Sequence, residues 1–211
     1  MKYLATARWI SCLMLAFGTP ALAAEVAYTL DPAHTETQFH WTHMGYSHPG
    51  AGFDDISGTL QWNGADITKS SVTVSIAVNS IHTHVTALDE KLRSKEFFDA
   101  EKFPKITFVS DKVEATEDPH RFTVSGKLTV HGITRDIDMD VTMNQAGIYP
   151  YLNVPAAGFD ATTSFNRSDF GLGEGVPLVS DRIDVHISTE ALEAVGFAKA
   201  MKAMQESGGK K

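Results

Sequence analysis

The sequence predicts an all-β protein in which about eight antiparallel strands close into a barrel, with a short helix inserted mid-chain and a second helix at the C-terminal end. Three observations support this prediction: apolar and polar residues alternate in successive segments, turn-forming residues separate these segments, and only two stretches show helical spacing of apolar residues. Alternation is typical of antiparallel sheets, because parallel sheets are buried on both faces. A wide sheet with one apolar face tends to close, since closure removes its unpaired edges.

The first strand is expected around Phe39. Two-residue periodicity gives it a core-facing side, made of Thr35, Thr37, Phe39, Trp41 and His43. The opposite, polar side is made of His34, Glu36, Gln38 and His40. The same alternation predicts later strands over residues 71–78, 106–113, 122–130, 136–143, 159–165 and 183–188. Chain reversals are predicted at Trp62-Asn63-Gly64, Glu117-Asp118-Pro119-His120 and Val130-His131-Gly132-Ile133.

Two segments have helical rather than alternating patterns. From His84 to Ser94 the apolar residues Val85, Leu88 and Leu92 fall on one helical face, which predicts a short amphipathic helix. A second helix is predicted from about Ala191 to Gln205. Because no long helical crossover separates the strands, neighbouring strands are expected to be joined as hairpins.

The first 23 residues have the layout of a cleaved signal peptide. Lys2 and Arg8 form a basic start, an apolar stretch runs from Ile10 to Phe17, and Ala21-Leu22-Ala23 provides the small residues that signal peptidase accepts. Cleavage is expected after Ala23 or one residue later. The predicted organisation is therefore a signal peptide over 1–23, a barrel domain over 24–193, and a helix with a tail over 194–211. The predicted location is the periplasm.

Composition excludes several classes of function. The single cysteine, Cys12, lies in the predicted signal, so the mature chain lacks thiol catalysis, thiolate metal sites and redox exchange. Without residues 1–23 the chain carries 16 basic and 26 acidic residues, which argues against binding to nucleic acid or to anionic lipid surfaces. No later segment reaches the ~20 apolar residues of a membrane-spanning helix, so no stable membrane insertion is expected. A monomer or a homodimer is expected.

Alternation alone leaves the interior undecided. An eight-stranded barrel is just wide enough either to be filled by side chains or to hold one small ligand. Apolar strand faces ordinarily form a packed core, and the pattern by itself favours that interpretation. Small residues on the inward faces would leave room, although a neighbouring phenylalanine could occupy it; these residues are Thr35, Thr37, Ala161 and Thr163.

Five spaced motifs bear on this question. The first is Asp31-Pro32-Ala33-His34-Thr35, followed by Phe39 and His43-x-Gly45-x-Ser47. The others are Ser80-Ile81-x-Thr83, then Leu92-Arg93-Ser94-Lys95-Glu96-Phe97-Phe98-Asp99 with Pro104, then Gly126-x-Leu128-Thr129-Val130-x-Gly132-x-Thr134, and finally Arg167-Ser168-Asp169-Phe170-Gly171. Together, in this order and at these separations, they resemble the YceI-like family of periplasmic polyisoprenoid-binding proteins. The resemblance extends from Asp31 to Glu193.

The resemblance implies a lipocalin-like barrel with an internal apolar tunnel. Such a tunnel would hold one long amphiphile, such as a polyisoprenoid, a quinone-like molecule or a fatty amide or acid, for sequestration or transport, with no catalysis and no cofactor. The expected apolar lining is Phe39, Trp41, Ile76, Val78, Phe108, Leu128, Met139, Val141, Phe159 and Phe165. Phe97, Phe98 and Phe170 are expected to gate the ends, and His43 and Arg93 to contact the head group. The chain departs from the family pattern at Leu88-Asp89-Glu90-Lys91-Leu92, where the family often has Arg-Asp-x-His-Leu.

Other functions compete with ligand carriage. The histidines gathered in two clusters could bind a metal, although periodicity separates His40 from His43; the clustered residues are His40, His43, His48, His82 and His84. A stress-related interaction protein without a ligand would make use of the C-terminal helix. Catalysis is disfavoured, because the chain has no Gly-x-Ser-x-Gly, no His-Glu-x-x-His and no phosphate-binding loop. No catalytic and no metal-binding residue is therefore predicted.

Overall fold

The computed structural model describes residues 25–208, so the predicted signal peptide and the last three residues of the tail lie outside the described residues. The strands are β1 Val26–His40, β2 Gly50–Phe53, β3 Ile56–Trp62, β4 Ser71–Ala77, β5 Ile81–His82, β6 Lys105–Ala115, β7 Arg121–Val130, β8 Ile133–Tyr149, β9 Val154–Asn166 and β10 Arg182–Glu193. The helices are α1 Thr86–Arg93 and α2 Ala194–Gly208, with short 3₁₀ turns η1 Ile67–Lys69, η2 Val78–Ser80 and η3 Arg167–Phe170.

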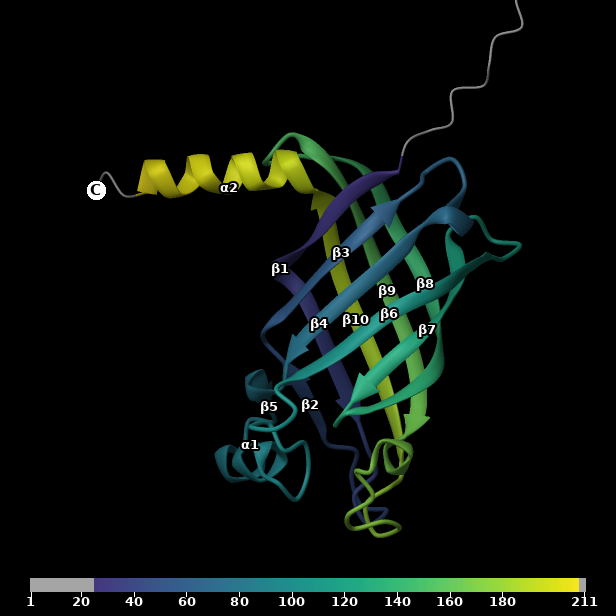
Figure 1. Cartoon of the computed structure of the whole chain (residues 1–211), viewed down its shortest axis with the longest axis vertical. Helices are drawn as coiled ribbons and strands as arrows, with labels where there is room; N and C mark the ends of the chain where they lie inside the picture. Colours follow the sequence, from purple (N-terminus) through teal and green to yellow (C-terminus); the bar gives the residue numbers. More distant parts are fainter. Residues whose placement is uncertain (1–24, 209–211) are drawn as a thin grey trace, which may run out of the picture.

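Eight of the strands form a closed antiparallel barrel, as predicted. Their order is β1-β3-β4-β6-β7-β8-β9-β10, and pairing of β10 with β1 completes the circle (Figure 1). β2 pairs with the second half of β1, beyond the part that pairs with β3, and β5 pairs with β2. The predicted faces are confirmed within β1, where Thr35 and Thr37 are buried and Glu36 and Gln38 are exposed. His43, expected on the inward face, is exposed beyond the end of the strand.

The two helices lie at opposite ends of the barrel (Figure 1). α1 follows β5 and lies beside one end, whereas α2 leaves β10 at the other end and points away from the barrel. Phe197 packs against Val154 and Leu192 and so holds the first turns of α2 on the barrel. Further along the helix, Met201 and Met204 are exposed. Within residues 25–208, neither helix has the length and hydropathy needed to cross a bilayer.

The α2 end of the barrel is closed by its own side chains. A cluster at this end joins the start of β1, the end of β3, the start of β9 and the end of β10; its buried members are Tyr28, Leu30, Leu60, Ala157, Phe159 and Ala191. Trp62 packs against this cluster with its ring 5.5 Å from the ring of Phe159. Such edge-to-face aromatic packing fills the end of the barrel tightly.

A bulge in β1 interrupts its pairing with β10. The register passes from Leu30 opposite Ala191 to Thr35 opposite Thr189, so residues 31–34 face Glu190 alone. Asp31, which is buried, accepts the backbone N–H of Ala33 at 3.0 Å and lies 2.6 Å from Nδ1 of His34. The first of the five motifs therefore shapes this bulge.

The Asp31–His34 contact predicts a pH dependence. The hydrogen bond to Asp31 is the largest of the effects that raise the pKa of His34 above 6.5. Since the folded pKa exceeds the unfolded one, the stabilisation is complete below about pH 6.5 and disappears as pH rises through the folded value. We expect NMR titration of the His34 ring to give a raised pKa, and Asp31→Asn, which keeps an acceptor for Ala33, to lower it. A His34 pKa at its ordinary value in the wild type would contradict this expectation.

Candidate functional site

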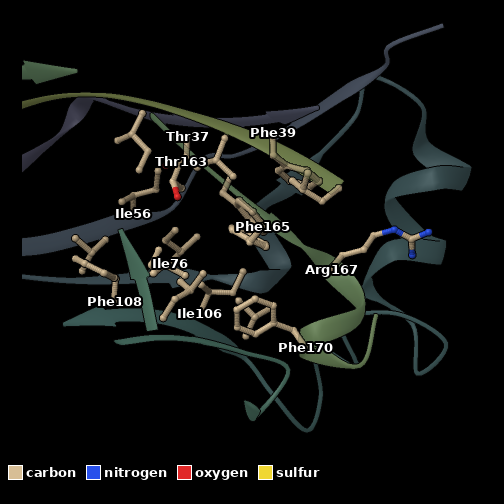
Figure 2. A pocket seen from close by; sticks show the side chains of 18 of the residues that line it. Thr37, Phe39, Ile56, Ile76, Ile106, Phe108, Thr163, Phe165, Arg167 and Phe170 are labelled. Carbon is tan, nitrogen blue, oxygen red and sulfur yellow. The ribbon is translucent and has the colours of Figure 1, made fainter. Parts of the chain in front are cut away.

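A cavity of about 700 Å³ occupies the interior of the barrel. The sheet faces therefore surround a hollow, which answers the question that the alternation left open. Its volume lies within the range of roughly 300–1,000 Å³ that is usual for small-molecule sites. Figure 2 shows apolar side chains from several strands directed into the same space, among them Ile76, Phe108 and Phe165.

Small side chains on neighbouring strands keep part of this space open. In the β9 region, Ala161 lies between Val141 of β8 and Ile187 of β10, and Ile187 in turn pairs with Thr37 of β1. All four residues line the cavity. Nearby, the hydroxyl groups of Thr35 and Thr189 hydrogen-bond to one another at 2.7 Å. Because each hydroxyl has a partner, these threonines add little polarity to the cavity wall.

Glycine makes room for one of the large lining residues. A Cβ atom at Gly126 of β7 would lie 2.4 Å from the carbonyl oxygen of Val109 and 2.6 Å from Cζ of Phe108. The ring of Phe108 therefore rests in the space above Gly126, against the wall. This placement leaves the centre of the barrel free of the ring.

The cavity opens at the α1 end. Four of its lining residues are exposed, and all four lie in segments at this end: His43, Ser47, Lys91 and Glu174. The other end is covered by the aromatic cluster that includes Trp62. Three segments border the opening, namely residues 41–49, residues 88–98 and residues 167–179.

Backbone hydrogen bonds join two of these bordering segments. The N–H of Met44 donates to the carbonyl oxygen of Leu178 at 2.7 Å, and the N–H of Ser180 donates to the carbonyl oxygen of Thr42 at 2.9 Å. The guanidinium of Arg167 donates to the carbonyl oxygens of Leu172, Val179 and Ser180. Arg167 thus holds the loop that follows η3 in place.

The third bordering segment is fixed by polar contacts around α1. The carboxylate of Asp89 accepts the backbone N–H of Thr83 at 2.7 Å and its hydroxyl at 2.6 Å. The hydrogen bond from the Thr83 hydroxyl is the main reason that the pKa of Asp89 is lowered. Arg93 donates to the carbonyl oxygens of Ile81 and Asn79 at 3.2 and 3.4 Å. These contacts tie α1 to the segment that precedes it.

Most of the residues proposed from the sequence as ligand contacts line the cavity. Nine of the ten predicted apolar residues do so: Phe39, Trp41, Ile76, Phe108, Leu128, Met139, Val141, Phe159 and Phe165. The three predicted gate residues, Phe97, Phe98 and Phe170, also line it, and so does His43. Whether any of them contacts a ligand stays a prediction.

The structure does not bring Val78 and Arg93 to the cavity. β4 ends at Ala77, and Val78 begins the 3₁₀ turn η2, so it packs in the core at 1 % exposure instead of continuing the inward row of Ile76. Arg93 turns its guanidinium to the carbonyl groups before α1. Neither residue belongs to the lining.

Sequence reasoning missed the three charged lining residues, Lys91, Arg167 and Glu174. The sequence contained a signal for the first two. Arg167 continues the inward two-residue row of Ala161, Thr163 and Phe165 along β9. Lys91 follows Leu88 by three residues on the apolar face of α1.

The two histidine clusters that the sequence suggested as a metal site do not bring three ligand atoms together among residues 25–208. Nδ1 of His82 lies 3.1 Å from Asp54, and its ring is 5.6 Å from the ring of His84. Among residues 25–208, one group of three side chains has the spacing for a metal ion, and it lies at the β1 bulge: Asp31, His34 and Glu190. None of the clustered histidines belongs to it.

Comparisons with known proteins match the whole barrel. A model of the YceI-like domain matches residues 28–191. The chain is 33% identical to a UPF0312 protein of Pseudomonas syringae pv. syringae (strain B728a), over 87% of this chain and 97% of the relative. It is 32% identical to a UPF0312 protein of Pseudomonas putida (strain KT2440), over 82% of this chain and 88% of the relative.

Solved structures share the fold. BcnA of Burkholderia cenocepacia has a TM-score of 0.69 at 23% identity and covers 76% of this chain and 98% of its own. A YceI protein of Campylobacter jejuni has a TM-score of 0.64 at 26% identity, with coverage of 72% and 90%. A polyisoprenoid binding domain from Saccharophagus degradans has a TM-score of 0.62 at 16% identity, with coverage of 80% and 99%.

Proposed function

The chain belongs to the YceI-like domain family, and from this premise we propose that it binds one long apolar amphiphile, a polyisoprenoid or quinone-like lipid, inside the barrel. The observation that carries the proposal is the cavity of about 700 Å³, whose lining is mostly apolar and whose exposed lining residues lie at the α1 end. The polyisoprenoid binding domain of Saccharophagus degradans, which shares the fold, supports the same ligand class.

Burial of the tail supplies the binding energy in this proposal. Each methylene transferred from water into an apolar site contributes about 0.8 kcal/mol, so a few isoprene units reach micromolar affinity before the cost of association. No reactive side chain is needed for this role. The proposed activity is therefore sequestration or transport without catalysis.

The proposed place of action is the periplasm, with residues 1–23 removed as a signal peptide. This proposal rests on the basic start, the short apolar stretch and the Ala21-Leu22-Ala23 site in the sequence. The charge of the chain fits a protein that does not bind anionic membrane surfaces through its barrel.

Native mass spectrometry of the protein recovered from its own periplasm tests these proposals together. We expect the mass of a chain that begins near Ala24 and a second species with a bound amphiphile, which solvent extraction then identifies. The double variant Phe39→Glu/Trp41→Glu should lose the adduct, because two carboxylates would lie in the apolar lining. Gln38→Glu is the matched control, since Gln38 immediately precedes Phe39 and lies on the exposed face of β1. The proposed function would be contradicted if the protein purified without a bound amphiphile and did not bind added ubiquinone.

A further inference from the structure

Two carboxylates and one imidazole come together at the β1 bulge, outside the cavity. Asp31, His34 and Glu190 each offer one donor atom, and the three atoms lie within 4.8 Å of one another. None of these side chains lines the cavity. The proposed binding of a lipid inside the barrel therefore leaves this cluster without a role.

The bulge itself brings the three side chains together. Residues 31–34 of β1 face Glu190 of β10 alone, so Asp31 and His34 are both presented to one residue of the neighbouring strand. The carboxylate of Asp31 is buried, and its Oδ1 atom accepts the backbone N–H of Ala33 at 3.0 Å. This hydrogen bond directs Oδ2 of Asp31 towards Nδ1 of His34, 2.6 Å away. Outer hydrogen bonds orient the ligands of protein metal sites in the same way.

Glu190 contributes a buried oxygen atom that has no partner. The side chain as a whole is 38% exposed, but its Oε2 atom is buried and forms no hydrogen bond with any of residues 25–208. Oε2 lies 3.7 Å from Nδ1 of His34, which is beyond hydrogen-bonding distance. A buried carboxylate oxygen without a partner is costly, and a cation between Glu190 and His34 would remove that cost.

The cluster carries uncompensated negative charge. Within the described part of the chain, no lysine or arginine forms an ion pair with Asp31 or Glu190, and His34 is the group that pairs with both. Burial, together with the carboxylates of Glu190 and Asp31, raises the pKa of the neighbouring Tyr149. A divalent cation would balance the two carboxylates, which a neutral imidazole cannot do.

The donor set fits a divalent transition-metal ion. Ligand atoms lie about 2.0–2.2 Å from zinc, so neighbouring ligand atoms are about 3–3.5 Å apart. The present separations of 2.6 Å from His34 to Asp31 and 3.7 Å from His34 to Glu190 lie on either side of this range. Because the side chain of His34 is 52% exposed, water can complete the coordination. One imidazole with two carboxylates suits zinc and its neighbours better than magnesium or calcium, which prefer oxygen ligands.

We propose that Asp31, His34 and Glu190 bind one divalent transition-metal ion, Zn²⁺ by preference, which links the bulge of β1 to β10. The cation takes the place of the proton between His34 and Asp31, with the neutral imidazole as ligand. Since residues 31 and 190 are far apart in the unfolded chain, the cation binds the folded state and stabilises the barrel. This role is structural and is independent of the cavity.

Titration calorimetry of protein recovered from the periplasm without a histidine tag, stripped of metal by a chelator, tests the site. We expect one Zn²⁺ to bind with a dissociation constant of about 1 μM. Mg²⁺ and Ca²⁺ should bind at least about a hundredfold more weakly. Zinc at about a hundredfold excess over the dissociation constant should raise the melting temperature by roughly 5–10 °C.

Variants assign the zinc to these residues. His34→Gln and Glu190→Gln should each weaken zinc binding about a hundredfold, since loss of a ligand costs at least as much as loss of an outer contact. Asp31→Asn, which keeps an acceptor for the Ala33 N–H, should do the same. The matched controls are His186→Gln and Glu36→Gln, because these residues are exposed on the same two strands, β10 and β1, and lie outside the cluster. Both controls should bind zinc as the wild type does.

Each other outcome overturns the proposal. If the wild type binds no zinc, or if zinc does not raise its melting temperature, the cluster is a hydrogen-bonded pair beside a carboxylate and no more. If binding survives unchanged in His34→Gln and Glu190→Gln, the zinc is an adventitious ion only, held by other histidines. The measurement is separate from lipid binding, because a chain that takes up no amphiphile can still bind zinc at the bulge.

Discussion

Replacing Ala161 with tryptophan should weaken the binding of geranylgeraniol about a hundredfold while the barrel stays folded. Ala161 lies on β9 between the lining residues Val141 and Ile187, in the middle of the cavity wall. An indole at this position would occupy the space that the tail needs. Displacing about four methylenes from the site costs about 3 kcal/mol, which weakens binding roughly a hundredfold.

Thr162→Trp is the matched control for this prediction. Thr162 is the next residue of β9, it is exposed, and it pairs with His186 on the outer face. The same large side chain there should leave the dissociation constant unchanged. Binding is measured by displacement of a fluorescent apolar probe, and folding by far-UV circular dichroism and the melting temperature. Wild-type affinity in Ala161→Trp would show that the ligand lies outside the barrel.

Gly126→Ala should lower the stability of the barrel strongly. The new Cβ would meet the carbonyl oxygen of Val109 at 2.4 Å and the ring of Phe108 at 2.6 Å. The backbone of Val109 is held by pairing of β6 with β7, so it cannot move away without weakening the sheet. Overpacking of this kind costs about 3 kcal/mol, which corresponds to a melting temperature roughly 10 °C lower.

Gly147→Ala is the control for the glycine prediction. Gly147 also lies in a strand, β8, but a Cβ there has no neighbour within 4 Å. This change should be neutral or stabilise the chain by about 0.5 kcal/mol, because alanine reduces the freedom of the unfolded backbone. Urea unfolding of both variants measures the difference. Equal stability of the two variants would contradict the packing described around Phe108.

The sequence predicted the barrel because strand faces are encoded locally. Alternation from Thr35 to Phe39 identified the inward side of β1, and Trp41 and His43, which lie beyond the end of the strand, also line the cavity. The turn His131-Gly132 is present as predicted, with positive φ angles of 50° and 73°. The inserted helix was also predicted, although α1 begins at Thr86 instead of His84. α2 begins at Ala194, later than the expected Ala191, because β10 continues to Glu193.

The candidate site was harder to predict because it depends on distances across the barrel. Alternation states which residues point inward, but not whether Phe108 crosses the centre or lies against Gly126. Val78 was assigned to the lining by extending the period of β4 one residue past its end. Arg93 and Arg167 could not be ranked from sequence, since both donate to backbone carbonyl groups that the fold brings together.

The aromatic cluster at the α2 end, with Trp62 against Phe159, leaves the α1 end for exchange of the proposed ligand. In the proposed function, an amphiphile enters with its hydrocarbon end leading and departs with its polar end leading. Lipids in a bilayer present the polar end to water, so a lipid must leave the membrane completely and reverse its orientation before it enters. Loading from vesicles is therefore limited by desorption of the lipid, and its rate should not increase with protein concentration.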